Sequence, residues 1–318
     1  MTLSPEALSR VLYLLVDMAG PIALGLWLRH LGLAGGRFNK ILIDVNVRGL
    51  FTWLAFVAFW KLELTASLLW VLPFVPVIML LPWPVMSWIT RKNADPLDRG
   101  ALVSSAILGN TATLGGLVCF LIFGAAGFAI VQLYAVVQNV LLVLLVFPLC
   151  QAFADMASGK TGERKRRTLR ETFLTWNQVS LLGMAAGACL SASGTPMPDA
   201  LERWFPWIVH LSAWINFLPV GLHLDFREAL SGWRATAPIL PIKFLLLPAV
   251  AWAFASLFVP DPLLAAVLIV ISACPTAINA VICTELYGLK TGTAVSSLVW
   301  TTVVFAFAVC PLLILALA

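Results

Sequence analysis

The sequence predicts an all-α integral membrane protein. Of its 318 residues, 61% are hydrophobic and only 11% are charged, and the mean hydropathy is +0.97. A chain of this composition cannot cover a globular surface with side chains that water solvates. Apolar stretches recur along it, each long enough to cross a hydrocarbon core about 30 Å thick as a helix, whereas β-barrel strands would give a weaker, alternating pattern.

Ten transmembrane helices are expected between loops that carry charges, Pro or Gly. They lie at 8–28, 41–60, 66–88, 100–123, 127–150, 176–193, 205–223, 235–258, 262–287 and 292–317. The first is too long for a signal peptide, and it is not followed by a cleavage site and a soluble domain, so we count it as a span.

The basic residues predict the orientation of these helices. Fifteen of the twenty Lys and Arg lie in loops that follow odd-numbered helices, and three lie on the opposite side. Because Lys and Arg accumulate in cytoplasmic loops, we expect the odd-numbered loops in the cytoplasm and both termini outside, in the cell inner (plasma) membrane. Placed in such loops, the net charge of +5 gives no reason to expect nucleic-acid binding.

A basic segment, SGKTGERKRRTLRET at 158–172, divides the chain near its middle. We expect a first five-helix repeat at 1–150, a cytoplasmic linker at 151–175 and a second repeat at 176–318. Because five is odd, the halves must lie in the membrane with opposite orientation, which is the geometry of inverted-repeat transporters. A lipid-binding or partner-binding role for the linker is the alternative, but the segment is short and lacks an apolar face.

The fourth and ninth helices match each other at an offset of 164 residues. The identical pairs are Ala101 and Ala265, Val103 and Val267, Ile107 and Ile271, Cys119 and Cys283, and Gly124 and Gly288. The shared ending, VCFLIFG against ICTELYG, is the strongest part of the match, since chance identities are common in apolar sequence.

Both of these helices are interrupted by polar residues at matching depth, GNTATLGG at 109–116 and CPTAINA at 274–280. A proline removes a backbone donor, and paired glycines let the chain leave helical geometry cheaply. Unpaired backbone groups are costly in lipid, so such breaks persist where protein or a wet cavity covers them. Two broken helices crossing near the midplane predict a binding site, although packing alone also produces Pro kinks and Gly contacts in membrane helices.

We expect a small organic anion to bind at these breaks. The N–H groups at the start of a half-helix form a partial positive pole that suits a carboxylate, and nearby hydroxyl and amide groups donate hydrogen bonds. The predicted substrate-binding residues are Asn110, Thr111, Thr113, Gly115, Gly116, Pro275, Thr276, Asn279 and, on the fifth helix, Asn139 with its neighbour Gln138. For that last pair, a helix–helix hydrogen bond is an equally good interpretation.

Lys243 lies near the centre of the eighth helix, where a charge is costly and usually has a partner or serves a pathway. We interpret it as the countercharge for an anion or as the replacement for an ion-coupling residue, with a structural ion pair as the alternative. Asp17, at comparable depth in the first helix, is a candidate partner. Asp44 and Arg48 are four residues apart and are expected to pair with each other.

The other polar residues are given no chemical role. His210, His223 and Asp225 are expected at the membrane interface, and the six cysteines are expected as buried packing residues. Because no Cys/His cluster has metal-ligand spacing, neither a metal nor a cofactor is predicted. The chain has no HExxH, GxSxG or paired-aspartate motif, so it is not expected to be an enzyme.

The two breaks and their neighbours resemble the auxin efflux carrier family, which includes bacterial organic-acid transporters and the plant PIN auxin exporters. The resemblance rests on GNTATLGGLVCFLIFGAAG at 109–127, LYAVVQN at 133–139, KFLLLPAV at 243–250 and CPTAINAVICTELYG at 274–288. The sequence departs from the family pattern at Leu117 and at Gly49, where prolines are usual in the fourth and second helices.

The resemblance implies a ten-helix fold with crossed fourth and ninth helices, related to sodium/proton antiporters and bile-acid symporters. Helices 1, 2, 6 and 7 would form a scaffold, and helices 3–5 and 8–10 a transport domain that moves as an elevator. The implied function is secondary active transport of a carboxylate such as malonate or malate, or of an auxin-like acid. Alternatives left open are a sodium-coupled symporter and a non-transporting sensor; proton or sodium coupling and a homodimer through the scaffold also remain open.

Overall fold

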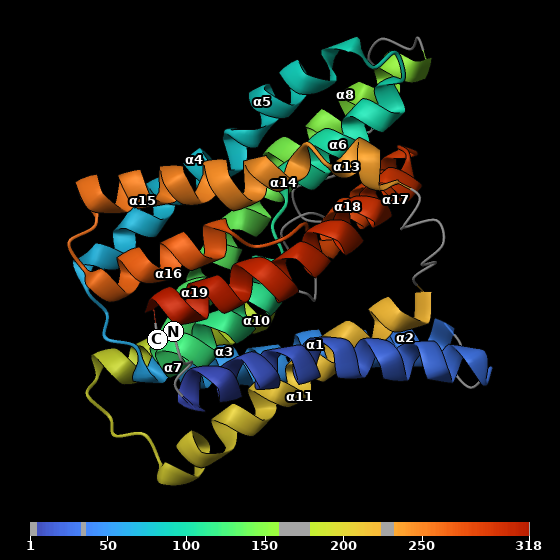
Figure 1. Ribbon diagram of the computed structural model, residues 1–318. Coiled ribbons are helices and arrows are strands. Elements are labelled where there is room, and N and C mark those ends of the chain that lie inside the picture. The colour runs from blue at the N-terminus through green and yellow to red at the C-terminus, as the bar shows by residue number, and fades with distance from the viewer. Residues whose placement is uncertain (1–4, 33–35, 159–178, 224–231, 318) are drawn as a thin grey trace.

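The computed structural model describes residues 5–32, 36–158, 179–223 and 232–317. Within them the chain is helical, apart from connecting turns and one antiparallel bridge between Gly109 and Thr276 (Figure 1). Residues 159–175 of the predicted linker lie outside the described residues, and so do Asp225 and Arg227.

The first half contains α1 (Pro5–His30), α2 (Gly36–Val45), η1 (Asn46–Leu50), α3 (Phe51–Lys61), η2 (Ala66–Trp70), α4 (Val71–Leu80), α5 (Pro82–Ile89), η3 (Thr90–Lys92), α6 (Pro96–Ile107), η4 (Thr111–Gly115), α7 (Gly116–Leu141), η5 (Leu142–Val146) and α8 (Phe147–Ser158), where η marks 3₁₀ or π-helical segments. The second half contains α10 (Val179–Ala192), α11 (Asp199–His223), α13 (Trp233–Thr236), α14 (Ile239–Pro241), η7 (Ile242–Leu246), α15 (Leu247–Phe258), α16 (Pro262–Ser272), α17 (Ile278–Tyr287), α18 (Thr291–Val304), η8 (Phe305–Val309) and α19 (Cys310–Leu317).

Six of the described helical runs are long and apolar enough to cross a membrane. They are Leu12–His30, Ala66–Lys92, Thr111–Ser158, Asp199–Leu222, Trp233–Phe258 and Thr291–Leu317. The 48-residue run Thr111–Ser158 includes a turn at Gly124, with φ of +67° and ψ of −153°. Glycine adopts these backbone angles readily because it has no Cβ. The ninth expected helix is present as the shorter α16 and α17. The chain is therefore a multi-pass membrane protein.

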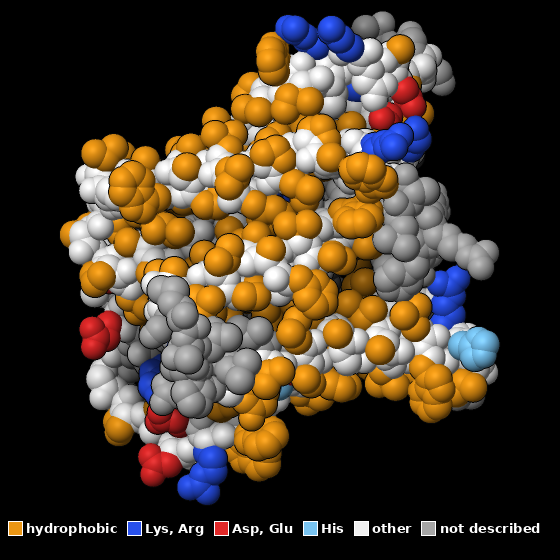
Figure 2. Space-filling view, in the orientation of Figure 1, with side chains coloured by type: hydrophobic (Ala, Val, Ile, Leu, Met, Phe, Trp, Pro, Cys, Tyr) orange, Lys and Arg blue, Asp and Glu red, His pale blue; other side chains and the backbone are white. Residues whose placement is uncertain are grey.

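The surface agrees with a lipid environment. Hydrophobic side chains cover the middle of the face in Figure 2, whereas Lys, Arg, Asp and Glu gather near the ends of the helices. Many large apolar side chains are exposed, among them Leu182, Trp207, Leu257 and Phe307. Exposed apolar area of this extent is favourable against acyl chains and unfavourable against water.

Two close helix pairs form one side of the molecule. α1 packs along α11, as Figure 1 shows, and α3 packs along α10. At each contact a glycine lies against a backbone carbonyl of the other helix, Gly221 against Ile22 and Gly187 against Phe56, at distances that leave no room for a Cβ. Small residues that allow backbones to approach in this way stabilise helix pairs in membranes.

Prolines explain several irregular turns in the other helices. The π-helical segments η5, η7 and η8 each end two residues before a proline, Pro148, Pro248 and Pro311 respectively. A proline has no N–H for the carbonyl four residues earlier, so the turn before it loses a hydrogen bond and widens. These helices remain continuous but are not regular.

Two sequence-based boundaries need correction. α8 continues to Ser158, so the first eight residues of the predicted linker at 151–175 are helical. α11 begins at Asp199 instead of residue 205, because its first turn is polar and hydropathy alone does not detect it. The longer helix places His210 near the middle of α11. Of the cysteines, Cys189 is exposed, contrary to expectation, and the other five are buried.

Candidate functional site

The two predicted helix breaks lie against each other. α6 ends at Ile107 and η4 begins at Thr111, while α16 ends at Ser272 and α17 begins at Ile278. Between them, the N–H of Asn110 donates to the carbonyl of Pro275 (2.7 Å), and the N–H of Ala277 donates to the carbonyl of Leu108 (3.0 Å). Each unwound segment lacks some of the backbone hydrogen bonds of a regular helix, and the other segment supplies partners for these backbone groups.

Side chains hold the second break in place. Thr276 is fully buried; its hydroxyl donates to the carbonyl of Ser105 (3.0 Å), and its N–H donates to the hydroxyl of Thr301 in α18 (2.9 Å). Pro275 is buried as well. Ser105 lies in the last turn of α6, where carbonyls have lost their helical partners, so Thr276 caps one helix while it belongs to the break in another. Neither Ser105 nor Thr301 was among the predicted residues.

The first break is held by an amide from the fifth expected helix. The side chain of Gln138 accepts a hydrogen bond from the buried Thr111 hydroxyl, and its Nε2 donates to the carbonyl of Gly109 (3.0 Å). Asn139 is exposed instead. Successive residues of a helix point about 100° apart, so these neighbouring amides face different surroundings. The structure therefore brings Gln138, and not Asn139, to the break.

Gly115 and Gly116 let other groups approach the first break closely. A Cβ on Gly115 would lie 2.9 Å from the sulfur of Cys274, in the second break, and a Cβ on Gly116 would lie 3.3 Å from the ring of Phe128. Both glycines are buried. Their role is to let the two breaks and α7 pack together without a side chain between them.

Lys243 joins the eighth expected helix to this site. Its side chain is 1% exposed, and its Nζ donates to the carbonyl of Leu108 (3.1 Å). Leu108 is the C-cap of α6, so the ammonium lies at the negative end of that helix. Asp17, the candidate partner of Lys243, does not contact it, because the carboxylate of Asp17 contacts His210 and Trp214 of α11.

Three of the predicted binding residues, Asn110, Thr113 and Asn279, are only partly buried. They lie at the beginnings of η4 and α17, where the first N–H groups of a helix have no partner within that helix. Thr111, Gly115, Gly116, Pro275 and Thr276 are buried beneath them. Hydrogen-bond donors are thus accessible at two helix N-termini, and the one buried cation described above lies at a helix C-terminus.

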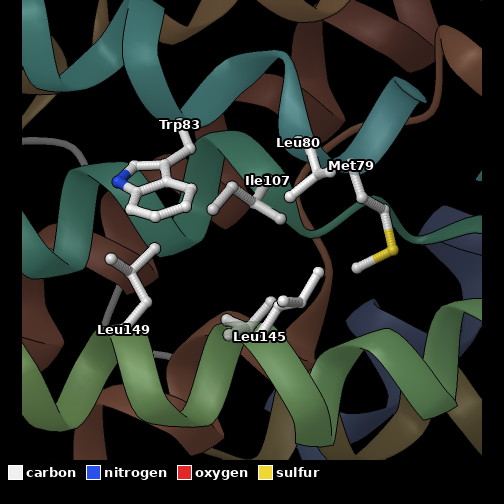
Figure 3. Close-up of a pocket in the computed structure, with 7 residues that line it drawn as sticks. Met79, Leu80, Trp83, Ile107, Leu145 and Leu149 are labelled. Carbon is white, nitrogen blue, oxygen red and sulfur yellow. The ribbon is translucent and has the colours of Figure 1, made fainter. Parts of the chain in front are cut away.

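An apolar pocket lies on the other side of α6. Its walls come from α4, α5, α6, η5 and α8, and Figure 3 shows Trp83, Leu80, Ile107, Leu145 and Leu149 converging on it. Nothing in this lining is charged, so the pocket does not suit an organic anion. Among the described residues, no group of three His, Cys, Asp or Glu side chains could hold a metal ion.

Comparison with known proteins bears on the part of the chain that contains Lys243 and the second break. Residues 216–313 match the family described as "Membrane transport protein". No curated protein matches the chain. The matched segment includes Lys243 and the second break, and its similarity to membrane transport proteins agrees with the resemblance of the motifs there to auxin efflux carriers.

Proposed function

We propose that the protein is a secondary active transporter of a small organic anion, such as malonate, malate or an auxin-like acid, and that the anion binds at the paired breaks. One observation carries this proposal: the unwound segments at Gly109 and Thr276 are joined by backbone hydrogen bonds. Irregular backbone at membrane depth is costly and is typical of substrate and ion sites in transporters.

An inverted repeat is supported by features that the halves share. α6 and α16 both begin after an Asp N-cap, Asp95 and Asp261, whose carboxylate accepts N–H groups of the first turn. The half-helices after the breaks both end at a glycine with positive φ, Gly124 at +67° and Gly288 at +65°. Equivalent start and end signals flanking two equivalent breaks favour two copies of one five-helix unit, with the fourth and ninth helices crossing.

The polarity of the breaks favours an anionic substrate. The N-terminal ends of η4 and α17, with Asn110 and Asn279, offer N–H groups and side-chain amides to a carboxylate. The ammonium of Lys243 is almost fully buried and binds a carbonyl. We therefore assign Lys243 to the site of a coupling cation, where it stabilises the break, and not to direct contact with the substrate.

An elevator motion is supported by the contact between the two groups of helices. α1, α3, α10 and α11 pack as glycine-mediated pairs and would form the scaffold. α7 meets this group through aromatic rings: Phe120 and Phe128 lie 5.6 and 5.8 Å from Phe205 of α11, measured between ring centroids. Apolar ring contacts of this kind are compatible with sliding, since no hydrogen bond must break.

The test is carboxylate transport by the purified protein in liposomes. Counterflow of labelled malonate, malate and an indole acid would be measured with and without sodium, beside ligand-induced thermal stabilisation. We expect saturable counterflow of at least one carboxylate that persists without sodium. In the Asn110→Ala, Asn279→Ala double variant, we expect ligand binding to weaken by more than about tenfold, since two hydrogen bonds to a charged ligand are lost.

A matched control is Gln151→Ala in α8, because the Gln151 amide is bonded within its own helix to Asp155 (2.7 Å). This variant should transport like the natural protein. Unchanged ligand affinity in the double variant would show that the anion binds elsewhere. Absence of counterflow for every carboxylate would contradict the proposed function itself.

A further inference from the structure

A second polar cluster lies between α1 and α11, separate from the breaks. Nδ1 of His210 lies 2.5 Å from Oδ2 of Asp17, and Nε1 of Trp214 donates to Oδ1 of the same carboxylate (3.0 Å). The Asp17 side chain is 5% exposed and that of His210 is 25% exposed. Both carboxylate oxygens are therefore occupied, and the imidazole retains access to the surroundings.

The cluster lies within two candidate membrane spans, Leu12–His30 and Asp199–Leu222. Asp17 is at the middle of the 26-residue α1, and His210 is at the middle of the 25-residue α11. Ionisable groups at this depth are costly and commonly serve proton pathways. Gly20 leaves room for the Trp214 ring, since a Cβ there would lie 3.0 Å from it. The carboxylate is thus held in one orientation by a rigid indole.

His210 also contacts the helix that follows the first break. The ring of Phe120, in α7, lies 6.2 Å from the imidazole, nearly perpendicular to it, and Tyr13 of α1 lies 5.6 Å away on ring centroids. α7 continues directly from η4, which follows the first break. The imidazole is therefore where the α1/α11 pair meets the part of the molecule that carries the breaks.

We propose that Asp17 and His210 form a proton-binding site that couples a pH gradient to anion transport. The proposal rests on the proposed transport function. A proton taken up by the imidazole makes the site an imidazolium–carboxylate pair of zero net charge, and its release leaves a single negative charge. Burying the neutral pair costs much less than burying the lone carboxylate, so the proton favours the closed contact with α7. A carboxylate substrate nearby would favour the protonated site for the same reason.

The other titratable groups around His210 do not replace this pair. From α1 it is faced by Asp17 and the phenol of Tyr13, and from α7 by the uncharged Phe120. Two ion pairs involve α11 or the elements packed against it: Asp44 of α2 with Arg48 of η1, and Lys61 of α3 with Glu202 of α11. The other described charged residues of α1 and α11 lie at least seven residues along their own helix from Asp17 or His210, and they are Arg10, Arg29, Asp199 and Arg203. Glu202 is eight residues from His210, about 12 Å along the helix.

The test uses the full chain in liposomes, with two readouts. The first is malonate accumulation driven by a pH gradient of one unit, which can support an accumulation of up to about tenfold per proton. We expect accumulation in the natural protein and none in Asp17→Asn or His210→Gln, while counterflow at equal pH is retained in both. Asp17→Glu keeps the carboxylate and should retain part of the accumulation.

The second readout does not need transport. The chain has three histidines, so in protein labelled with ¹⁵N-histidine the His210 signal can be assigned by its loss in His210→Gln. We expect this signal to report binding of a proton to the imidazole of the natural protein. In Asp17→Asn the imidazole loses its carboxylate partner, so the response of this signal to pH should differ from that of the natural protein.

Ser212→Ala is the matched control. Ser212 is in α11, like His210, and its hydroxyl donates to the side chain of Asn46 in η1 (2.8 Å). This buried hydrogen bond joins two helices and involves no titratable group. The Ser212→Ala variant should be less stable than the natural protein and should retain gradient-driven accumulation of malonate. If Asp17→Asn still accumulates malonate, or if His210 does not titrate, the proton site is refuted. If the natural protein shows no counterflow at all, the transport proposal fails, and the NMR titration alone then decides whether the pair binds a proton.

Discussion

The ammonium of Lys243 and the carbonyl of Leu108 form a hydrogen bond of 3.1 Å, and the same carbonyl accepts the N–H of Ala277 at 3.0 Å. One oxygen in the first break is thereby bound to the second break and to the eighth expected helix. A buried ammonium has three donors and no acceptor, so it can fill the role of a fixed cation at this junction. The consequences for mutation follow from which of these bonds is removed.

Replacing Lys243 should separate stability from transport. Lys243→Met removes a buried charge and leaves Leu108 its bond to Ala277, so the free energy of unfolding should change by no more than about 1 kcal/mol. Transport should fall by about tenfold or more, as expected for losing a hydrogen bond from a charged group. Lys243→Arg should not restore it, because a planar guanidinium does not fit a fully buried ammonium site. Counterflow rates and thermal unfolding in detergent measure the two effects; undiminished transport in the Met variant would rule out the assigned role.

Thr276→Val should destabilise the fold itself. The change preserves shape but leaves the Ser105 carbonyl without its hydroxyl donor in a buried position, which costs about 1–3 kcal/mol. Thr276→Ser keeps the hydroxyl and should lose less. The measurement is the free energy of unfolding in a denaturing-detergent titration, and equal stability of the Val and Ser variants would contradict the prediction.

The neighbouring amides Gln138 and Asn139 should respond differently. Gln138→Leu removes the partner of Thr111 and the donor to the Gly109 carbonyl, so substrate affinity should fall by about tenfold as the first break loses its support. Asn139→Leu changes an exposed side chain and should cost less. The two dissociation constants, measured by ligand-induced thermal shift, test this order directly; a larger loss in the Asn139 variant would favour the sequence-based assignment over the geometry.

The glycine contact between α1 and α11 predicts a further effect on stability. In Gly221→Ala the new Cβ meets the backbone carbonyl of Ile22, which cannot move as a side chain would, and overpacking of this kind costs about 1–3 kcal/mol. Gly49→Ala is the matched control, because a Cβ there has no neighbour within 4 Å. Unfolding of the two variants in the same detergent series distinguishes a specific close approach from a general cost of removing glycine.

The backbone breaks at the candidate site could be predicted because their sequence signals are local. Pro275 and the paired glycines of the first break change backbone geometry wherever they occur in a helix, and both predicted breaks are present. The buried position of Lys243 follows from its depth in an apolar span. These inferences need no knowledge of which helices are neighbours.

The missed partners all depend on which helices pack together. Depth in the membrane makes Asp17 a candidate partner of Lys243, but the packing of α1 on α11 gives Asp17 the partners His210 and Trp214. Gln138 and Asn139 could not be separated, because in a uniformly apolar helix no periodicity marks the inward face. Thr301 sits in a polar run of the last expected helix, TGTAVSSLVWTT at 291–302, which is the signal that could have pointed to it.

The pairing of Gly109 with Thr276 also bears on how the chain is made. The Asn110 N–H and the Leu108 carbonyl find their partners at Pro275 and Ala277, more than 160 residues later in synthesis. At ribosomal rates that interval is roughly 10–30 s. During it, the newly inserted first half has an open break whose polar groups need water, lipid headgroups or an insertion chaperone. Assembly of this protein should therefore be completed only when the ninth helix enters the membrane.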